Sequence, residues 1–265
     1  VGPGALDPDR YEHVNRHCDV LVDGAGPAGL AAARVAAAAG ARVILVEETD
    51  ALGGRLLSDP LDDATIDGAS PEDWVARVEA DLRAAPETTV LTRACAFGYY
   101  ADNWVGVVED LADHLAPADR AAQGPRHRLW RIRAKRVVLA TGAIERPIVF
   151  HGNDRPGVML ASAVRTYVRR YGVAPGRKAA IFTNNDDAWT TAFALKAAGV
   201  EIAALIDLRA EPGAAIRAEA ERLGLPLRLG ATIVDASGRK ALSGVDVMRL
   251  DPSGAPTGAR EAIAC

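Results

Sequence analysis

Cysteine and histidine are scarce in this chain of 265 residues, and their placement excludes several kinds of site. The three cysteines lie far apart, at Cys18, Cys95 and Cys265. This spacing excludes a CxxC redox pair, a cysteine-rich metal site and a disulfide framework, and it suits a reducing, cytoplasmic location. The five histidines show no metal-ligand spacing, since the pair His13 and His17 lies in a segment expected to be non-helical. We therefore expect a cytoplasmic protein without a metal site.

Long hydrophobic runs and a large net charge are also lacking. The best candidate for a membrane span, Leu30–Val46, is interrupted by Arg34, Gly40 and Arg42, and no uncharged apolar run approaches the roughly 18 residues that a span needs. The 35 acidic and 31 basic residues give a formal charge of −4, which provides no electrostatic footprint for nucleic acid or an anionic membrane. The sequence therefore predicts neither nucleic acid nor a membrane as a partner.

Apolar side chains, in contrast, are abundant enough for sizeable cores. Hydrophobic residues make up 49% of the sequence and charged residues 25%, a composition too apolar for disorder. At roughly 150 residues per domain, the length predicts about two domains. The chain begins with Val1 rather than Met and ends abruptly at Cys265, so we expect it to be a piece of a longer protein.

The first half of the chain predicts a strand–helix–strand unit followed by further strands. Asp19–Val22 is a short apolar run typical of a buried parallel strand, and a glycine-rich turn leads from it into an alanine-rich helix, Leu30–Ala39. Arg42–Val46 is a second buried strand, and Ser70–Ala85 begins with a helix-capping pattern. Further strand-like segments lie at 88–94, 96–101, 104–108, 128–133 and 136–139.

The second half repeats this order. Strands are expected at 178–183, 201–206, 227–234, 245–250 and 261–265, and helices at 186–198 and 214–223. The repeat predicts an α/β fold: two nested Rossmann-like FAD/NAD(P)-binding domains with parallel sheets and antiparallel β-meanders. The predicted organisation is a lead-in segment at 1–17, a dinucleotide-binding domain at 18–146, a connecting bridge with a helix at 147–177, and a second Rossmann-like domain with a degenerate nucleotide loop at 178–265.

The strongest motif is a G-x-G-x-x-G fingerprint at 24–29, placed between the first strand and the first helix. Gly24 permits the tight turn, Gly26 lets the backbone approach a pyrophosphate, and Gly29 lets helix and strand pack closely. Glu47 follows 18 residues after Gly29, where a carboxylate accepts hydrogen bonds from ribose hydroxyls and repels a 2′-phosphate. The motif therefore predicts a dinucleotide site that prefers NAD over NADP.

Two further turns leave alternatives open. Gly53-Gly54-Arg55 is either an exposed loop or a second glycine turn beside the same pyrophosphate, with Arg55 as counter-charge. Thr141 and Gly142 end a strand expected in the same sheet, and they form either a plain turn or a place where the backbone approaches a ligand.

The corresponding loop of the second half, 183–189, contains no glycine. Asp186 and Asp187 stand where a phosphate would meet the helix, and we expect them to cap the helix and repel an anion. An acid, Asp207, still follows the second strand. The second domain is thus expected to bind no dinucleotide, unless the two asparagines of the loop donate amides to another ligand. No nucleophile or general base stands out anywhere, so no catalytic residue is predicted.

These motifs, in this order, resemble the two-dinucleotide-binding flavoproteins. The stretches ALDPDRYEHVNRHCDVLV at 5–22, TGAIERPIVFHGNDRPGVMLASAVRTYVRRYGVAPG at 141–176 and TNNDDAW at 183–189 resemble the alpha subunit of heterotetrameric sarcosine oxidase. The resemblance covers almost the whole chain, which corresponds to a middle, dinucleotide-binding portion of that subunit.

The resemblance implies a function and a set of partners. The complex of alpha, beta, gamma and delta subunits oxidatively demethylates sarcosine to glycine, forming hydrogen peroxide and, with tetrahydrofolate, methylenetetrahydrofolate for one-carbon metabolism. The chemistry takes place on flavins: the beta subunit holds FAD, and FMN lies at the alpha–beta interface. The fingerprint site of the alpha subunit holds NAD, with FAD as the alternative occupant.

The resemblance also implies the residues that contact the dinucleotide. They are Gly24, Gly26, Pro27, Ala28, Gly29, Glu47, Glu48, Gly54, Arg55, Thr141 and Gly142, with the backbone near Ala96 meeting the adenine. Two departures stand out: Asp23 replaces an apolar residue of the family, and the chain stops before the strand that completes the first domain. We therefore expect an incomplete first domain, and an isolated chain that is inactive.

Two rival hypotheses accompany this one. The first is the alpha chain of a related FAD/NAD-dependent dehydrogenase acting on opines, proline or glycine, which shares the same nested folds. The second is a non-catalytic nucleotide-binding scaffold, which the degenerate second loop and the lack of catalytic residues favour.

Overall fold

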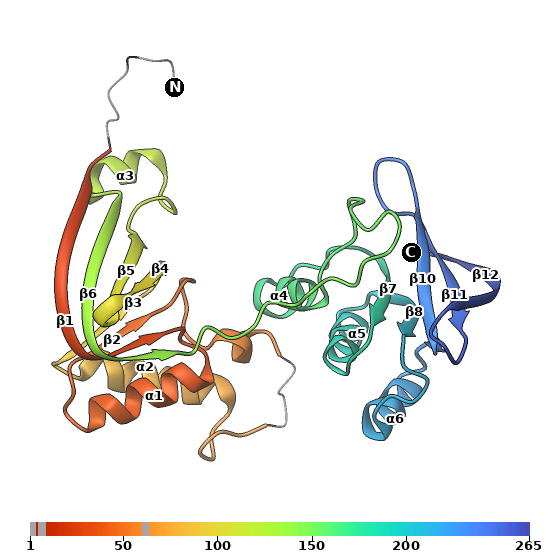
Figure 1. The fold of residues 1–265 in the computed structure, drawn as a ribbon, viewed down its shortest axis with the longest axis horizontal. Helices are drawn as coiled ribbons and strands as arrows, with labels where there is room; N and C mark the ends of the chain where they lie inside the picture. Colours follow the sequence, from red (N-terminus) through yellow and green to blue (C-terminus); the bar gives the residue numbers. More distant parts are fainter. Residues whose placement is uncertain (1–3, 5–8, 60–63) are drawn as a thin grey trace. The chain divides into compact units, whose positions relative to one another are not determined.

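The computed structural model describes residues 4, 9–59 and 64–265, which form two compact units (Figure 1). Unit 1 contains the described residues within 1–56 and 61–143, and unit 2 those within 57–60 and 144–265. The chain thus crosses into unit 2 twice, first for a short segment that begins at Leu57 and again at Ile144. The domain boundaries expected from the sequence stay predictions.

Unit 1 is a six-stranded sheet with helices. Its elements are β1 (Tyr11–Asp23), α1 (Pro27–Ala38), β2 (Val43–Val46), the 3-10 helix η1 (Gly54–Leu57, whose last residue lies in unit 2), α2 (Pro71–Ala84), β3 (Thr88–Leu91), β4 (Ala94–Tyr100), η2 (Ala101–Asn103), β5 (Trp104–Asp110), α3 (Pro117–Gln123) and β6 (His127–Leu139). The strand order is β3-β2-β1-β6-β5-β4, in which the first four strands are parallel and β5 and β4 pair antiparallel. The predicted α/β class, with a parallel sheet and antiparallel strands, is confirmed.

The two central strands are longer than the sequence predicted. β1 begins at Tyr11, so residues 11–17 of the expected lead-in segment belong to a strand, paired in parallel with β6 from His127 onward. The calls on residues 1–3 and 5–8 lie outside the described residues. The two strands expected at 128–133 and 136–139 are likewise one strand. The prediction failed because most side chains of 11–17 are exposed, so no alternation of apolar and polar residues marks the strand. Cross-strand ion pairs stabilise it instead, such as Arg128 with Glu12 at 2.7 Å.

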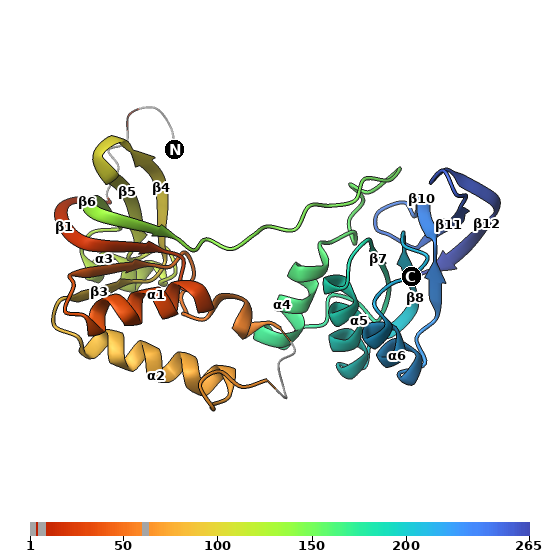
Figure 2. The same ribbon diagram turned by 60° about the horizontal axis from the view of Figure 1, so that its bottom comes forward.

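The sheet of unit 1 is buried on both faces where β1 pairs with β2. Val22 and Leu45 pack against α1 and α2, which lie together on one side of the sheet (Figure 2). Leu21 and Ile44 point to the opposite face, where they pack with Val107 of β5 and other residues of the antiparallel strands. This explains the uninterrupted apolar runs of β1 and β2, since strands covered on both faces need no alternation.

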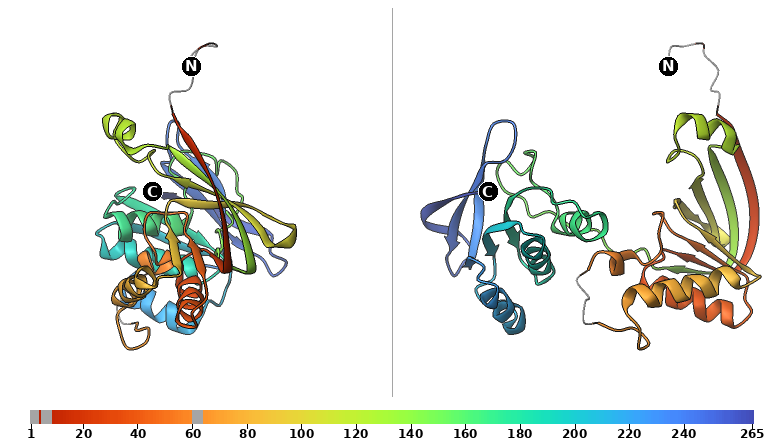
Figure 3. Two further views of the ribbon diagram at one scale, coloured as in Figure 1. Left: turned by 90° about the vertical axis from the view of Figure 1, so that its left-hand side faces the viewer. Right: turned by 180° about the vertical axis from the view of Figure 1, so that it is seen from behind.

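Unit 2 has two three-stranded sheets and three helices among the described residues. Its elements are α4 (Ala161–Tyr171), β7 (Lys178–Thr183), α5 (Asp187–Ala197), β8 (Glu201–Asp207), α6 (Ala214–Arg222), β9 (Leu227–Leu229), β10 (Ala231–Ser237), β11 (Gly244–Leu250) and β12 (Pro256–Ala264). The order β7-β8-β9 is parallel and β10-β11-β12 antiparallel. The antiparallel sheet is formed by the C-terminal part of the chain, drawn in blue to dark blue in Figure 3. The strand expected at 227–234 is in fact two strands in different sheets, because Gly230 turns the chain with a φ of +59°. Within the described residues, no helix combines the length and the apolar character needed to cross a membrane.

Candidate functional site

The three glycines of the fingerprint have different surroundings. Gly24 has a φ of +96°, and a Cβ built on it would lie 2.4 Å from the carbonyl oxygen of Ala140. A Cβ on Gly29 would lie 1.8 Å from the carbonyl oxygen of Gly24. Gly26, in contrast, has an extended backbone, and its Cβ would meet no described atom within 4 Å. Packing within the protein therefore requires two of the glycines, whereas the third faces open space.

The N-terminus of α1 is open. Gly26 is its N-cap residue, no described side chain caps this end, and the first turn contains no acidic residue. Pro27 occupies the first helical position, where no N–H is needed. The unpaired backbone N–H groups and the positive end of the helix dipole make such a terminus a binding site for anions.

The second glycine turn packs directly against the fingerprint. The N–H of Gly53 donates to the carbonyl of Ala25 at 2.8 Å, and a Cβ on Gly54 would lie 2.9 Å from the Cα of Gly26. Gly54 has a φ of +54°, which the absence of a side chain permits. Arg55 follows in η1 and is exposed. The structure thus places this turn beside the fingerprint.

The turn after β6 lies on the other side of the fingerprint. The N–H of Ala140 donates to the carbonyl of Asp23 at 2.7 Å, which brings the start of the turn next to Gly24. Thr141 and Gly142 follow and are exposed, and Gly142 has a φ of +71°. Three segments far apart in the sequence therefore meet at the carboxyl end of β1, the edge where ligands bind in open α/β sheets.

Glu47 is held in place by three hydrogen bonds. The residue is only 7% exposed, and its Oε2 accepts a hydrogen bond from the N–H of Ala25 at 2.9 Å. Oε1 accepts from both the N–H and the hydroxyl of Thr49, each at 2.9 Å. The neighbouring Glu48 is exposed. Sequence reasoning found Glu47 but missed Thr49, and no motif marks a threonine at this position.

Ala96 lies close to the same edge because β4 starts beside the end of β2. The N–H of Ala94 donates to the carbonyl of Glu47 at 2.9 Å, two residues before Ala96. Ala96 and Asp23 line a surface hollow of about 230 Å³, together with apolar residues such as Leu139. Asp23 is half-buried there, and its pKa is raised by burial and by the negative charges of Glu47 and Glu48.

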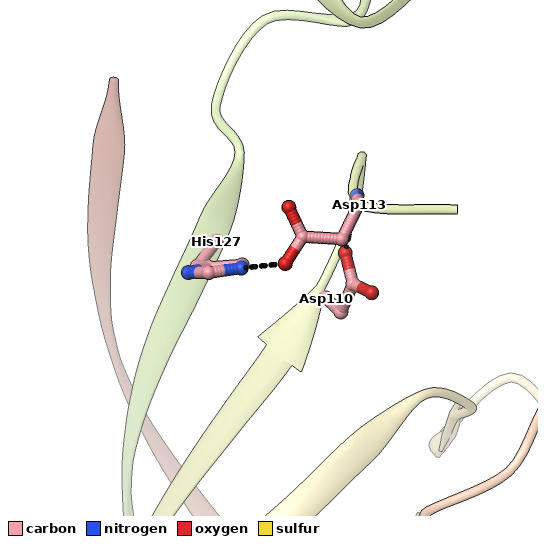
Figure 4. A group of neighbouring side chains, drawn as sticks. All are labelled: Asp110, Asp113 and His127. Atoms are coloured by element: carbon pink, nitrogen blue, oxygen red, sulfur yellow. Dashed lines mark hydrogen bonds and ion pairs between the residues drawn. The ribbon is translucent and has the colours of Figure 1, made fainter. Parts of the chain in front are cut away.

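A separate cluster joins Asp110, Asp113 and His127, whose side chains face one another at the end of β5 and the start of β6 (Figure 4). The imidazole Nε2 of His127 lies 2.8 Å from a carboxylate oxygen of Asp113. The same carboxylate pairs with Arg126, and these two partners lower the pKa of Asp113 to about 2. Asp110 accepts backbone hydrogen bonds from Ala112 and Asp113. An ion-pair network accounts for this arrangement, which is not visible in the sequence spacing.

The loop of unit 2 is closed by its own side chains. Trp189 and Asp207 are both fully buried, and the indole Nε1 donates to the carboxylate at 2.8 Å. Arg209 donates to the same carboxylate from its backbone N–H at 2.8 Å and from its guanidinium at 2.8 and 3.1 Å. Both oxygens of Asp207 therefore have two donors each, which saturates the acid that corresponds in position to Glu47.

The predicted capping of α5 by its two aspartates is wrong. Asp186 makes no capping hydrogen bond and pairs with Arg209 at 2.7 Å instead. The N–H of Asp187 is capped by Oδ1 of Asn185 at 3.0 Å, and the amide of Asn185 donates to Asn184. The asparagines thus bond within the loop. Asp186 has a helical backbone conformation, with φ −78° and ψ −21°, and not the extended one typical of a capping residue, and its carboxylate is bound by Arg209.

Comparison with known proteins agrees with this geometry. Residues 19–113 match the family of FAD dependent oxidoreductases. The chain is 50% identical over 241 residues to the sarcosine oxidase alpha subunit of Rhizobium meliloti. This alignment covers 91% of this chain and 23% of the relative. The chain is thus similar to the sarcosine oxidase alpha subunits over more than nine tenths of its own length. It spans about a quarter of the length of these relatives.

More distant relatives share parts of the same architecture. The A subunit of opine oxidase from Agrobacterium tumefaciens is 30% identical over 206 residues, covering 75% of this chain and 39% of that relative. The crystal structure of L-proline dehydrogenase from P. horikoshii superposes with a TM-score of 0.65 at 22% identity, covering 99% of this chain and 43% of that one. At this identity the likeness shows the fold alone.

Proposed function

We propose that unit 1 binds a dinucleotide with a free ribose 2′-hydroxyl, NAD in the first place and FAD as the alternative. The open space at Gly26 carries the proposal, because a Cβ on Gly24 or Gly29 of the fingerprint would collide with backbone atoms, whereas one on Gly26 would meet no described atom within 4 Å. The open N-terminus of α1, with Pro27, Ala28 and Gly29 in its first turn, supports the same assignment.

Each side chain of the site then has a task. Glu47 accepts hydrogen bonds from the ribose hydroxyls and would repel a 2′-phosphate, with Glu48 adding negative charge beside it. The turns at Gly54–Arg55 and Thr141–Gly142 flank the pyrophosphate, with Arg55 as counter-charge, and the backbone near Ala96 meets the adenine. When bound, either dinucleotide supplies a ring system that carries hydride; the residues of this chain bind and orient it.

The wider role we propose is that of the nucleotide-binding part of a sarcosine oxidase alpha subunit, together with beta, gamma and delta subunits in the cytoplasm. The complex would demethylate sarcosine to glycine, with oxygen reduced to hydrogen peroxide, on FAD held by the beta subunit with FMN at the interface. The 50% identity over 91% of the chain supports this role. The chain alone is expected to be inactive, because we assign no catalytic residue to it.

A second candidate is the alpha chain of an opine-oxidising enzyme or of a proline or glycine dehydrogenase. The 30% identity to the A subunit of opine oxidase favours this candidate, because the alignment with that relative covers three quarters of this chain. Co-purification with partner subunits and assay of sarcosine against opines, proline and glycine would separate the two. Oxidation of an opine but not of sarcosine would replace the first candidate by the second.

Calorimetric titration tests the binding proposal. We expect NAD to bind at one site per chain, and NADP at least about tenfold more weakly, because Glu47 repels the additional phosphate. Glu47→Gln should lose this discrimination, whereas Glu48→Gln, one residue away and exposed, should largely keep it. Equal or tighter binding of NADP to the unmodified chain would overturn the assignment of Glu47, and FAD binding more tightly than NAD would reverse the order of the two candidates.

A further inference from the structure

The chain crosses into unit 2 at two points, each directly after one of the two turns of the proposed site. Asp59 lies four residues after Arg55, in the segment that begins at Leu57. Glu145 lies three residues after Gly142, just beyond the second crossing at Ile144. Both acids bind the same helix of unit 2, α4. No motif in the sequence indicates that these two acids bind the same helix.

Arg165 of α4 holds the first crossing. Its side chain is 1% exposed, and its Nη2 lies 3.0 Å from a carboxylate oxygen of Asp59. The other end of the guanidinium, Nη1, donates to the carbonyl of Asp187 at 3.0 Å and to the hydroxyl of Thr190. Burying a guanidinium is unfavourable by several kcal/mol unless it is paired, and the carboxylates of Asp59 and Asp187 both pair with Arg165, Asp59 at the shorter distance.

Glu145 holds the second crossing at the N-terminus of α4. Its two carboxylate oxygens accept hydrogen bonds from the N–H groups of Ala161 and Ser162, at 3.2 and 2.7 Å. The N-cap residue, Leu160, provides no side-chain cap. A carboxylate at this end of a helix is stabilised by free N–H groups and by the helix dipole. One helix thus binds both segments, each through an acid.

We infer that α4 is an anchor for the dinucleotide site of unit 1, and that Arg165, Asp59 and Glu145 are positioning residues for the two turns that flank the pyrophosphate. This inference rests on the proposed dinucleotide function. The glycine turn needs such an anchor, because Gly53 and Gly54 both have positive φ and η1 has no buried residue. Releasing the end of a turn leaves its ordering to be supplied by the ligand, which weakens binding.

The test compares two carboxylates that share Arg165. Asp59→Asn removes the charge at the first crossing. Asp187→Asn removes a carboxylate of α5 that lies 3.3 Å from the same guanidinium. In the 265-residue chain, we expect Asp59→Asn to weaken NAD binding by about three- to tenfold and to accelerate amide exchange at 53–57. Asp187→Asn should leave the NAD dissociation constant within about twofold, even where both variants lower the melting temperature equally.

The outcomes separate the anchor from the binding proposal. The anchor role of α4 would be contradicted if Asp59→Asn left both the NAD affinity and the amide exchange at 53–57 unchanged. It would also be contradicted if Asp59→Asn and Asp187→Asn weakened NAD binding equally. If the unmodified chain binds no NAD, ADP or FAD, the proposed function fails, while faster exchange at 53–57 in Asp59→Asn alone would still support the anchor. Should Asp59→Asn not fold, Glu145→Gln tests the second crossing by the same readouts, with exchange followed at 140–144.

Discussion

The two units contain the same strand–loop–helix–strand arrangement, but their loops differ: Gly26 of unit 1 faces open space, whereas Asp207 of unit 2 is bonded by neighbouring side chains. In unit 1, Gly29 and Glu47 are 18 residues apart; in unit 2, Trp189 and Asp207 have the same separation. The backbone N–H two residues after the acid donates to its carboxylate in both, at 2.9 Å from Thr49 and 2.8 Å from Arg209. The geometry is thus repeated, and the difference lies in the side chains at the glycine position and after the acid.

That difference closes the second loop. Gly29 has no side chain, whereas Trp189 at the corresponding position has an indole that donates a hydrogen bond to the carboxylate of Asp207. The guanidinium of Arg209 donates to the same carboxylate. The helix ends differ in charge as well, because α1 has no acid in its first turn and α5 has Asp187. In unit 2 the protein's own side chains thus satisfy the acid at the position that corresponds to Glu47.

Truncating Trp189 should have the largest effect. Trp189→Ala removes a fully buried indole and the donor to buried Asp207, so we expect it to lower the free energy of unfolding by about 3–5 kcal/mol. Denaturant unfolding measures this, with Trp189→Phe as the control that keeps most of the volume. A loss below about 1 kcal/mol would contradict the view that the indole is an integral part of this fold.

Gly26→Val should abolish binding and spare folding. The added side chain enters open space, where the pyrophosphate is proposed to lie, so we expect NAD affinity to fall at least about 100-fold with little change in melting temperature. Gly29→Ala is the opposite control, because its methyl group would collide with the carbonyl of Gly24 and should destabilise the chain. Residual stoichiometric binding by folded Gly26→Val would reveal a second working site.

Asp23→Asn should have the smallest effect, and it depends on pH. The pKa of Asp23 is raised in the folded chain, so folding favours its protonated form. Its contribution to the free energy of unfolding is therefore fully present below its ordinary pKa of about 4, and it is lost as the pH rises through the raised value. The variant should therefore be more stable than the unmodified chain at pH 7 by about 0.5–1 kcal/mol, bind NAD a few-fold more tightly, and show no such advantage at pH 3. Weaker NAD binding at unchanged stability would make Asp23 a ligand contact.

The sequence predicted the parts of the fold that follow from local pattern. The fingerprint, Glu47 and the buried runs of β1 and β2 were visible because glycine spacing and apolar runs are local signals. Residues 11–17 were missed because an exposed strand carries no burial pattern. Arg165 was missed for another reason: its carboxylate partners, Asp59 and Asp187, lie far along the chain, and only the folded chain brings them together. Arg209 lies two residues after Asp207, but no motif marks an arginine at this position.

The central claim is that this chain has one working dinucleotide site and one that its own side chains have closed. Calorimetric titration of the unmodified chain with ADP, the half that NAD and FAD share, tests it most directly. We expect one ADP per chain in the unmodified protein and none in Gly26→Val. Two ADP molecules per chain, or one that persists in the folded variant, would contradict the account.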